Sequence, residues 1–221
     1  MTHDEALRIL RDADLYGITA ECFSHGRDNI AVVEDMLKAG IPVLQYREKE
    51  KSMREKYEQC VRLRELTSRF GALFLVNDHI DLSLAAHADG VHIGQDDIPL
   101  EAVRRLLGPN KIIGLSTHSP EQAKDAVRQG ADYIGVGPIY RTYTKKDVCD
   151  PVGLSYLRYA AEHVPLPFVT IGGIKEHNVA EVVRNGAKCV CMVSEIAGAE
   201  NIEQKVKDIR TKMKEAQHES V

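Results

Sequence analysis

The sequence predicts one α/β domain, a single (β/α)8 TIM barrel that spans residues 1–221. Short β-rich runs alternate with helix-like segments, and eight such units follow one another along the chain. Crossovers of helix length between successive strands imply that the strands pair in parallel. Polar and glycine-rich clusters follow the strands, as expected for the ligand-binding rim of a barrel. An open doubly wound sheet is the alternative, but it usually contains fewer units.

The first half of the chain contains four units after a helical extension at residues 1–14. Gly40, Gly71 and Gly108 each follow a helix-like segment, where glycine is a common helix stop. The expected strands are residues 15–19, 43–47, 72–76 and 90–93. The expected helices are residues 27–39, 52–70, 78–86 and 99–107.

The second half repeats this rhythm, with one long interruption. Ser119 and Pro120 form a helix cap followed by proline at the first helical position. The expected strands are residues 111–115, 132–137, 167–171 and 188–193. The expected helices are residues 119–130, 154–162, 178–186 and 202–216. Residues 138–152 form an unusually long polar loop, and residues 217–221 are expected to be a frayed tail.

Composition limits the classes of ligand. The formal net charge is −4, so the chain has no general attraction to nucleic acid. It contains no tryptophan and only four phenylalanines, which makes stacking on bases a poor explanation of function. An anionic ligand would therefore be held by local basic groups.

The five cysteines include no CxxC pair, which favours reduced thiols in the cytoplasm. The N-terminal residues are charged throughout and do not resemble a secretory signal. No apolar run approaches the length of a membrane span. We therefore expect a cytoplasmic protein without a membrane partner.

Gln45, Arg47 and Lys49 occupy alternate positions at the end of the second expected strand. Alternate residues of a strand point to one face, so these three side chains would lie together. An unpaired cation is costly to bury, and the face would therefore hold an anion such as a phosphate or diphosphate. The alternative is a strand end in solvent, neutralised by Glu48 and Glu50.

Two acidic clusters follow neighbouring strands. Asn77 and Asp78 follow the third strand, and Asp97 belongs to the cluster after the fourth. Carboxylates placed close together repel unless a cation lies between them, and Mg²⁺ accepts one or two carboxylates with water and phosphate oxygens. The alternative is that both clusters are simple helix caps.

Two more clusters fall on the same rim, one after the fifth strand and one in the long loop. Ser116 and His118 follow the fifth strand, where His118 is either an acid/base or a polar filler. Thr142, Thr144 and Lys145 would supply two hydroxyls and a cation from the long loop, unless that loop is a plain basic connector.

The seventh and eighth strands end at Gly-Gly and Val-Ser sequences. Glycine allows the backbone to approach a phosphate closely, so Gly173, Val193 and Ser194 are candidate phosphate contacts. The alternative is a tight turn that needs glycine. HExxH and GxSxG are both absent, which argues against zinc hydrolysis and acyl transfer.

Read together, these motifs resemble those of the thiamine phosphate synthases. The segments occur in the family's order between residue 15 and about residue 197. They are QYREK, NDH, DGVHIGQDD, GLSTHS, DYIGVGPIYRTYTKKD, TIGGI and VSEI. The resemblance implies a transferase that joins hydroxymethylpyrimidine diphosphate to a thiazole phosphate, or its carboxylated form, and releases pyrophosphate. The implied chemistry is a Mg²⁺-assisted dissociative substitution that forms a C–N bond.

The resemblance also implies roles for particular residues. The pyrimidine diphosphate would contact Gln45, Arg47, Lys49 and Asn77. Mg²⁺ would be bound by Asp78 and Asp97. The departing pyrophosphate would contact Ser116 and Lys145, which join Arg47 and Lys49 as catalytic residues. The thiazole phosphate would contact Thr142, Thr144, Gly173, Val193 and Ser194. The implied partners are these two small phosphorylated molecules, and a homo-oligomer is compatible with the sequence.

The chain departs from the family at two places. Arg141 stands where the loop usually has proline, and the first strand ends Thr-Ala-Glu rather than Thr-Asp.

Two other functions stay open. A thiazole tautomerase of the same fold is kept open by His118, and a non-catalytic sensor of phosphorylated ligands is not excluded by fold.

Overall fold

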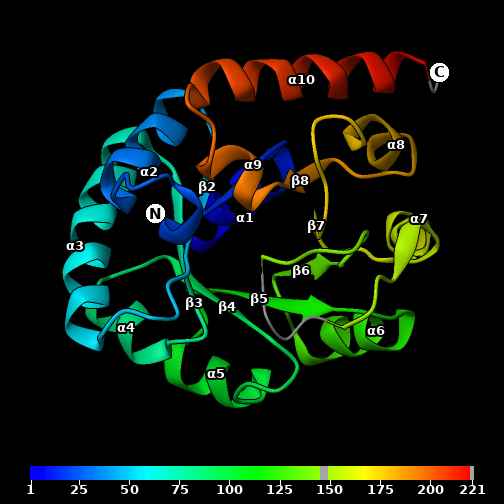
Figure 1. Cartoon of the computed structure of the whole chain (residues 1–221). Coiled ribbons are helices and arrows are strands. Elements are labelled where there is room, and N and C mark those ends of the chain that lie inside the picture. The colour runs from blue at the N-terminus through cyan, green and yellow to red at the C-terminus, as the bar shows by residue number, and fades with distance from the viewer. Residues whose placement is uncertain (145–148, 220–221) are drawn as a thin grey trace.

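The structure is a closed barrel of eight parallel strands surrounded by helices (Figure 1). It is a computed structural model that describes residues 1–144 and 149–219. The strands pair in sequence order from β1 to β8. A parallel bridge between Leu15 and Val190 joins the last strand to the first, where the Val190 amide donates to the Asp14 carbonyl at 2.9 Å. The predicted (β/α)8 barrel is therefore confirmed.

The strands are short and nearly entirely buried, as expected for a parallel sheet covered on both faces. They are β1 Tyr16–Ile18, β2 Val43–Tyr46, β3 Leu73–Asn77, β4 Gly90–Ile93, β5 Ile112–Thr117, β6 Tyr133–Val136, β7 Phe168–Ile171 and β8 Cys189–Cys191. Each overlaps a strand expected from the sequence.

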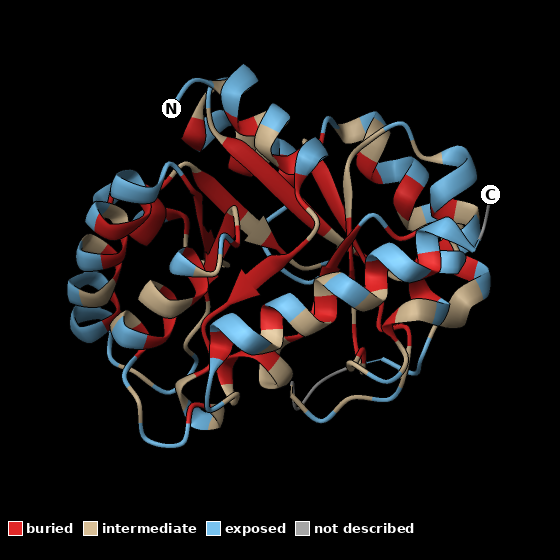
Figure 2. Cartoon of the chain, turned by 90° about the horizontal axis from the view of Figure 1, so that it is seen from above, coloured by how far each residue is buried: buried red, intermediate tan, exposed pale blue. Residues whose placement is uncertain are grey.

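The helices cover the barrel, with their buried faces on it and their exposed faces in solvent (Figure 2). They are α1 His3–Asp12, α2 Asn29–Lys38, α3 Met53–Phe70, α4 Ile80–Ala85, α5 Leu100–Leu107, α6 Pro120–Gln129, α7 Gly153–His163, α8 Val179–Arg184, α9 Val193–Ala197 and α10 Ile202–His218, with a short 3-10 turn, η1, at Glu21–Phe23. No helix within residues 1–144 and 149–219 is long and apolar enough to cross a membrane.

The sequence did not predict α9. The expected strand continued to Val193, but β8 ends at Cys191 and α9 begins two residues later. Hydrophobicity does not mark this boundary, because Met192, Ile196 and Ala197 are as buried as the strand itself. The apolar run therefore continues from a strand into a helix that packs beside β1.

The amino-terminal helix covers one end of the barrel. Thr2 and Glu5 form a reciprocal capping box that starts α1. Ala6 and Leu10 then join a core that lies inside the ring of strands, together with Val43 and Leu73. The end of the barrel opposite the strands' carboxyl ends is thus closed by apolar packing.

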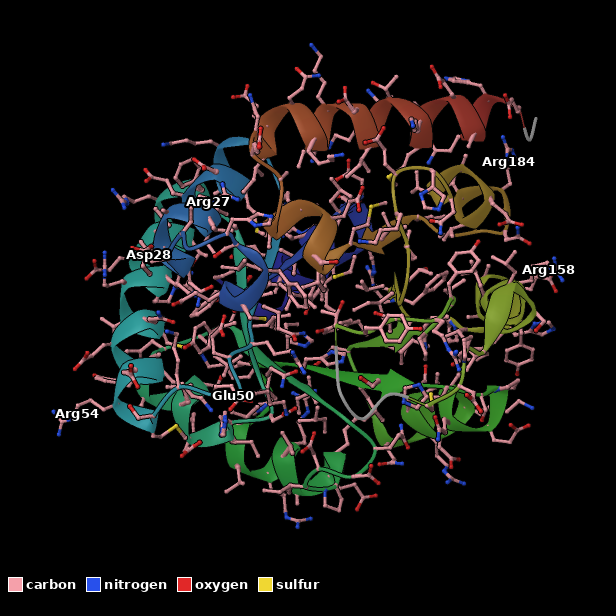
Figure 3. All side chains as sticks on the ribbon, in the orientation of Figure 1. Arg27, Asp28, Glu50, Arg54, Arg158 and Arg184 are labelled. Carbon is pink, nitrogen blue, oxygen red and sulfur yellow. The ribbon has the colours of Figure 1, made fainter. Side chains whose placement is uncertain are left out.

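The last helix extends further than expected. α10 includes Gln217 and His218, two residues of the segment expected to be frayed. Beyond it, Arg184 of α8 donates to the Glu219 carboxylate at 2.7 Å, and Figure 3 labels Arg184 beside this end of α10. This ion pair is exposed, so its contribution to stability is small.

Side chains of β2 alternate between two cores, as the spacing predicts. Val43 and Gln45 point into the barrel, whereas Leu44 and Tyr46 pack against the helices. Full burial of an aliphatic or aromatic side chain contributes roughly 1.5–3 kcal/mol. A shift of register by one residue would exchange the two faces, so this outer packing fixes which side chains reach the interior.

We expect Gly90→Ala to lower the free energy of unfolding by about 3 kcal/mol, because the added methyl group would overlap the backbone of Ile112 in the next strand. Urea unfolding followed by circular dichroism measures the change. Gly17→Ala in β1 is the matched control. Its methyl group would meet side chains and no backbone, with the Met36 sulfur nearest at 3.2 Å and Leu44 and Ile41 at 3.4 and 3.5 Å, so a loss below about 1 kcal/mol is expected. Equal losses in the two variants would contradict the steric explanation.

Candidate active site

A cavity of about 450 Å³ opens at the carboxyl ends of the strands. All eight strands, or the loops that directly follow them, contribute side chains to its wall. Among the predicted site residues, the wall includes Gln45, Arg47, Asn77, Ser116, Thr142, Thr144, Gly173, Val193 and Ser194. A shallower hollow of about 500 Å³ lies between α1 and α3 at the opposite end and contains none of them.

Gln45 and Arg47 share one face of β2, as the alternation predicts, and both reach the cavity. The Arg47 amide donates to Oγ1 of the buried Thr19 at 2.8 Å, which fixes the backbone where the strand ends. The Arg47 guanidinium makes no hydrogen bond or ion pair with the rest of the described chain. It is therefore available for an anionic ligand.

Lys49 reaches the rim by a different route from the one predicted. The strand periodicity would have to continue to residue 49, but β2 ends at Tyr46. The Lys49 ammonium pairs with Asp78 Oδ2 at 2.9 Å and is not part of the cavity wall. Its position is determined by this ion pair rather than by the pleat of a strand.

Glu48 holds the turn that carries these cations. Its Oε1 accepts from the Glu21 amide at 3.0 Å and from the Asn29 side chain at 2.8 Å. Because Glu48 points outward into this network, its neighbours Arg47 and Lys49 are directed toward the rim. Glu48 is therefore an anchor of the turn rather than a solvent-facing neutraliser, whereas Glu50 is exposed.

Asp78 and Asp97 interact directly, as the acidic clusters predicted. Burial alone would raise the pKa of Asp78, but the hydrogen bond and charge of Lys49 outweigh it and lower that pKa below its ordinary value. Burial, together with the charge of Asp78, raises the pKa of Asp97, although the Gly94 amide opposes this by donating to Asp97 at 2.7 Å. One carboxylate is thus readily ionised while its partner resists ionisation.

This pair fits a hard divalent cation. Two adjacent carboxylates that disfavour joint ionisation are stabilised when a cation lies between them. Asp78 adopts a left-handed backbone conformation, with φ of 60°, which is uncommon for a residue other than glycine and is often associated with functional sites. No group of three or more histidine, cysteine or acidic side chains suited to a metal occurs among the described residues. Most of the coordination shell would therefore come from water and ligand oxygens.

Two histidines lie beside the centre of the cavity. His92 of β4, which the sequence interpretation missed, contacts Ser116 Oγ through Nε2 at 2.9 Å. His118 Nδ1 lies 2.6 Å from the Gly137 carbonyl, so Nδ1 must be the donor because a carbonyl only accepts. Neutral His118 is consequently left with an unprotonated Nε2.

The opposite side of the cavity is built from glycine and hydroxyl groups. Gly172 and Gly173 have positive φ values of 102° and 65°, and the loop after β6 packs directly on them. The Tyr140 amide donates to the Gly172 carbonyl at 2.9 Å, which brings Thr142 and Thr144 next to the glycine pair. Any side chain at either glycine would displace this loop.

Lys175 is a cationic wall residue that the sequence interpretation missed. Its ammonium donates to Ser194 Oγ at 3.0 Å and pairs with Glu195 at 3.1 Å. The Lys175 amide donates to Asn178 Oδ1 at 2.7 Å, and Asn178 in turn donates to the Gly173 carbonyl at 3.2 Å. The sequence did contain a signal for this cationic residue, since a lysine stands two positions after the Gly-Gly pair.

A chain of alternating charges lies behind this lysine. Glu195 also approaches Lys205 at 3.7 Å, and Lys205 pairs with Glu176 at 2.7 Å. Lys212 pairs with the other carboxylate oxygen of Glu176 at 2.8 Å. The segment after β7 is thereby tied to α10.

Lys145, the remaining predicted catalytic residue, lies outside the described residues. Arg141, at the position where proline was expected, is an exposed part of the cavity wall beside Thr142.

The fold and cavity define a (β/α)8 barrel protein with a ligand site at the carboxyl ends of its strands, where separate sets of groups are suited to anions. Residues 15–196 match the family described as thiamine monophosphate synthase. The chain belongs to this family.

Similar proteins cover nearly its whole length. The thiamine-phosphate synthase of Pelotomaculum thermopropionicum is 59% identical over 210 residues, which cover 95% of this chain and 96% of that relative. The thiamine-phosphate synthase of Caldicellulosiruptor saccharolyticus is 51% identical over 215 residues, which cover 97% of each. Among solved structures, a thiamine phosphate pyrophosphorylase from Pyrococcus furiosus superposes with a TM-score of 0.84 at 35% identity, covering 94% of this chain and 98% of that one.

The charges behind Lys175 predict an acid-sensitive contribution to stability. Hydrogen bonds from Lys205 and Lys212 lower the pKa of Glu176 from 4.5 to about 2. Folding therefore favours the ionised form, so the stabilisation is complete above pH 4.5 and is lost as pH falls toward 2. The Glu176 side chain is 26% exposed, and screening limits the effect to about 1 kcal/mol or less.

Urea unfolding at pH 7 and pH 3 tests this expectation with Glu176→Gln. The variant should be less stable than the parent protein at pH 7, and this difference should shrink at pH 3. Glu162→Gln is the control, because Glu162 is 68% exposed and its only ion pair within residues 1–144 and 149–219, with His163, is 3.9 Å long. A difference for Glu176→Gln that stays constant with pH would contradict the assignment.

Proposed function

We propose that this protein acts as a thiamine phosphate synthase. It joins hydroxymethylpyrimidine diphosphate to a thiazole phosphate, or its carboxylated form, and releases pyrophosphate, together with CO2 when the carboxylated form reacts. Family membership and the names of relatives at 51–59% identity support this activity. They place the expected reaction among transferases that form a C–N bond.

The observation that carries the proposal is that one cavity has two different anion-binding sides. One side has the Arg47 guanidinium, which has no partner among the described residues, with the Lys49–Asp78 pair at the adjacent rim. The other side combines Gly173, Ser194 and Lys175. Two phosphorylated substrates need two such sides, whereas a receptor for one phosphate needs only one.

The residues are suited to a reaction in which charge develops on a leaving group. The C–O bond between the pyrimidine methylene and the diphosphate breaks, and its electron pair leaves with the pyrophosphate. The thiazole nitrogen lone pair forms the new C–N bond. Arg47 and Lys49 would stabilise the leaving diphosphate, and the Ser116 hydroxyl would donate to it. The attacking nitrogen carries no proton, so no strong general base is needed.

Mg²⁺ would be held by Asp78 and Asp97. When bound, the ion would act as a Lewis acid that stabilises negative charge on the diphosphate oxygens. The hydrogen bond from the Gly94 amide orients Asp97, and the ion pair with Lys49 orients Asp78. These contacts keep both carboxylates at the rim beside the candidate diphosphate groups.

A second activity, thiazole tautomerisation, is favoured by one observation. Neutral His118 has an unprotonated Nε2, because its Nδ1 donates to the Gly137 carbonyl, and this nitrogen could accept a proton from a ligand. We propose coupling as the principal reaction because both anion-binding sides are present.

We also propose a cytoplasmic location, which is supported by the five free cysteines.

The first test supplies both phosphorylated substrates to the purified protein and measures thiamine phosphate and pyrophosphate. We expect equal amounts of the two products with Mg²⁺, and a loss on the order of 100-fold after chelation, because charge on the diphosphate is then poorly neutralised. Asp97→Asn should lower product formation to a similar extent, because it removes one of the two carboxylates that would hold Mg²⁺. Asp96→Asn is the matched control.

Three results would decide against the proposal or part of it. Tautomerisation without coupling would favour the second activity. Binding of both ligands without any product would indicate a sensor. Full coupling in the presence of chelator would reject the magnesium assignment while leaving the coupling activity in place.

A second test concerns Lys175. Lys175→Met should raise the KM for the thiazole phosphate about tenfold, because a charge-assisted hydrogen bond to the phosphate is lost. The KM for the pyrimidine diphosphate should change little, since that ligand is expected at the opposite side of the cavity. Steady-state kinetics with each substrate varied in turn separates the two effects.

Lys188→Met provides the control, because it removes one positive charge from an exposed position just before β8, at the far end of the barrel. Equal changes in both KM values for Lys175→Met would show that Lys175 does not distinguish the two substrates.

A further inference from the structure

The interior of the barrel contains a continuous line of polar side chains. Gln45 Nε2 donates to the Tyr16 hydroxyl at 2.9 Å, and the Tyr16 and Tyr133 hydroxyls are 2.8 Å apart. The Tyr133 hydroxyl is 2.8 Å from His92 Nδ1, and His92 Nε2 is 2.9 Å from Ser116 Oγ. All five residues belong to the cavity wall. This line from Gln45 to Ser116, called the relay below, therefore runs along the ligand site where its wall meets the core.

The neighbouring strands leave room for this line. Gly114 of β5 pairs in register with Tyr133 of β6, and a methyl group at Gly114 would overlap the Tyr133 ring. Gly135 faces His92, whose Cε1 would lie 3.4 Å from an added methyl group. Tyr16 and Tyr133 are 2% and 0% exposed. Burying polar hydroxyls is unfavourable unless their hydrogen bonds are made, so apolar side chains would fill the interior more simply.

The hydrogen-bond directions follow from the Gln45 amide. Since the amide donates to Tyr16, the Tyr16 proton needs another acceptor, and Tyr133 is the one available within the described residues. The Tyr133 proton then goes to His92 Nδ1. Neutral His92 consequently carries its own proton on Nε2, which donates to Ser116 Oγ.

We propose that Tyr16, Tyr133 and His92 act as positioning residues that leave the Ser116 hydroxyl free to donate to the diphosphate of the substrate. Because Ser116 already accepts from His92, its own proton points to a different partner. Ser116 lies in the cavity wall, so a ligand oxygen there is the natural acceptor. This inference rests on the proposed function for the identity of the ligand.

The opposite arrangement would have different consequences. If the Gln45 amide were reversed, Tyr16 would donate to it and every later hydrogen bond would reverse as well. His92 would then carry its proton on Nδ1, and the Ser116 proton would be directed at His92 Nε2. Ser116 would face a ligand only as an acceptor, which is unsuited to a diphosphate. The tautomer of His92 therefore distinguishes the two arrangements.

Burial supports the relay in another respect. It raises the pKa of both Tyr16 and Tyr133, so both hydroxyls keep their protons at any working pH. The rings also restrain one another, with centroid separations of 6.1 Å between the tyrosines and 5.4 Å between Tyr133 and His92. The line can thus orient Ser116 without itself changing charge.

Nitrogen-15 NMR of the intact, ligand-free protein tests the direction of the relay. Neutral His92, assigned by the loss of its signals in His92→Asn, should show a protonated Nε2 and an unprotonated Nδ1. In Tyr133→Phe, Nδ1 loses its donor, and a mixture of tautomers is expected. Tyr156→Phe is the matched control, because it removes another buried hydroxyl, one that donates to Thr117 at the side of the barrel facing α7. It should keep the tautomer of the parent protein.

Coupling kinetics tests what the relay does. Tyr133→Phe should lower kcat about tenfold and change each KM less than threefold. Ser116→Ala should lower kcat at least as much, and the double variant should lose no more than Ser116→Ala alone. Tyr156→Phe combined with Ser116→Ala should show multiplied losses. If Tyr133→Phe fails to fold, Tyr16→Phe interrupts the same line one step earlier.

An Nδ1-protonated His92 in the parent protein would overturn the proposal, and so would multiplied losses for Tyr133→Phe and Ser116→Ala. The NMR measurement needs no substrate. A protein with the expected tautomer but no coupling activity would therefore refute the proposed function and leave the arrangement of the relay intact.

Discussion

Closure of the parallel sheet is the constraint on which the rest of the structure depends. The pairing of Leu15 with Val190 joins the two ends of the chain of strands. Only in a closed ring do the carboxyl ends of β2 and β8 come close, with β1 alone between them, so that Arg47 and Ser194 both contribute to the wall of one cavity. An open sheet of the same strands would place these two residues far apart, with five strands between β2 and β8. The apolar contacts between barrel and helices thus also determine the geometry of the site.

Much of this arrangement could be predicted because it follows from short-range rules. Period-two alternation places Gln45 in the interior and Tyr46 outside, and strand-to-helix alternation predicts a rim where strand ends meet. The position of Lys49 could not be obtained in this way, because it depends on an ion pair with a residue 29 positions further along the chain. The start of α9 was hidden for another reason, since hydrophobicity is continuous across the end of β8.

The histidine and lysine that the sequence interpretation missed illustrate a second limit. His92 stands within a strand, where the alternation indicates only that it faces inward. Its significance comes from Tyr133, 41 positions away, and from the room provided by glycines on two other strands. Lys175 is similar, because its place beside Ser194 exists only after β7 and β8 pair. Residue types mark candidates, but tertiary neighbours determine which of them act together.

The two anion-binding sides share one electrostatic arrangement. In the described chain, Lys49 and Lys175 are each paired with an acid, Asp78 and Glu195. A lysine that turns to a ligand phosphate leaves its acid partner uncompensated, which would oppose binding. Glu195 has a second cation close by, since Lys205 lies 3.7 Å away. Asp78 has no second lysine or arginine partner among the described residues, and the cation proposed between the two carboxylates would fill that role. The same requirement for charge compensation is thus met by a protein side chain on one side and would be met by Mg²⁺ on the other.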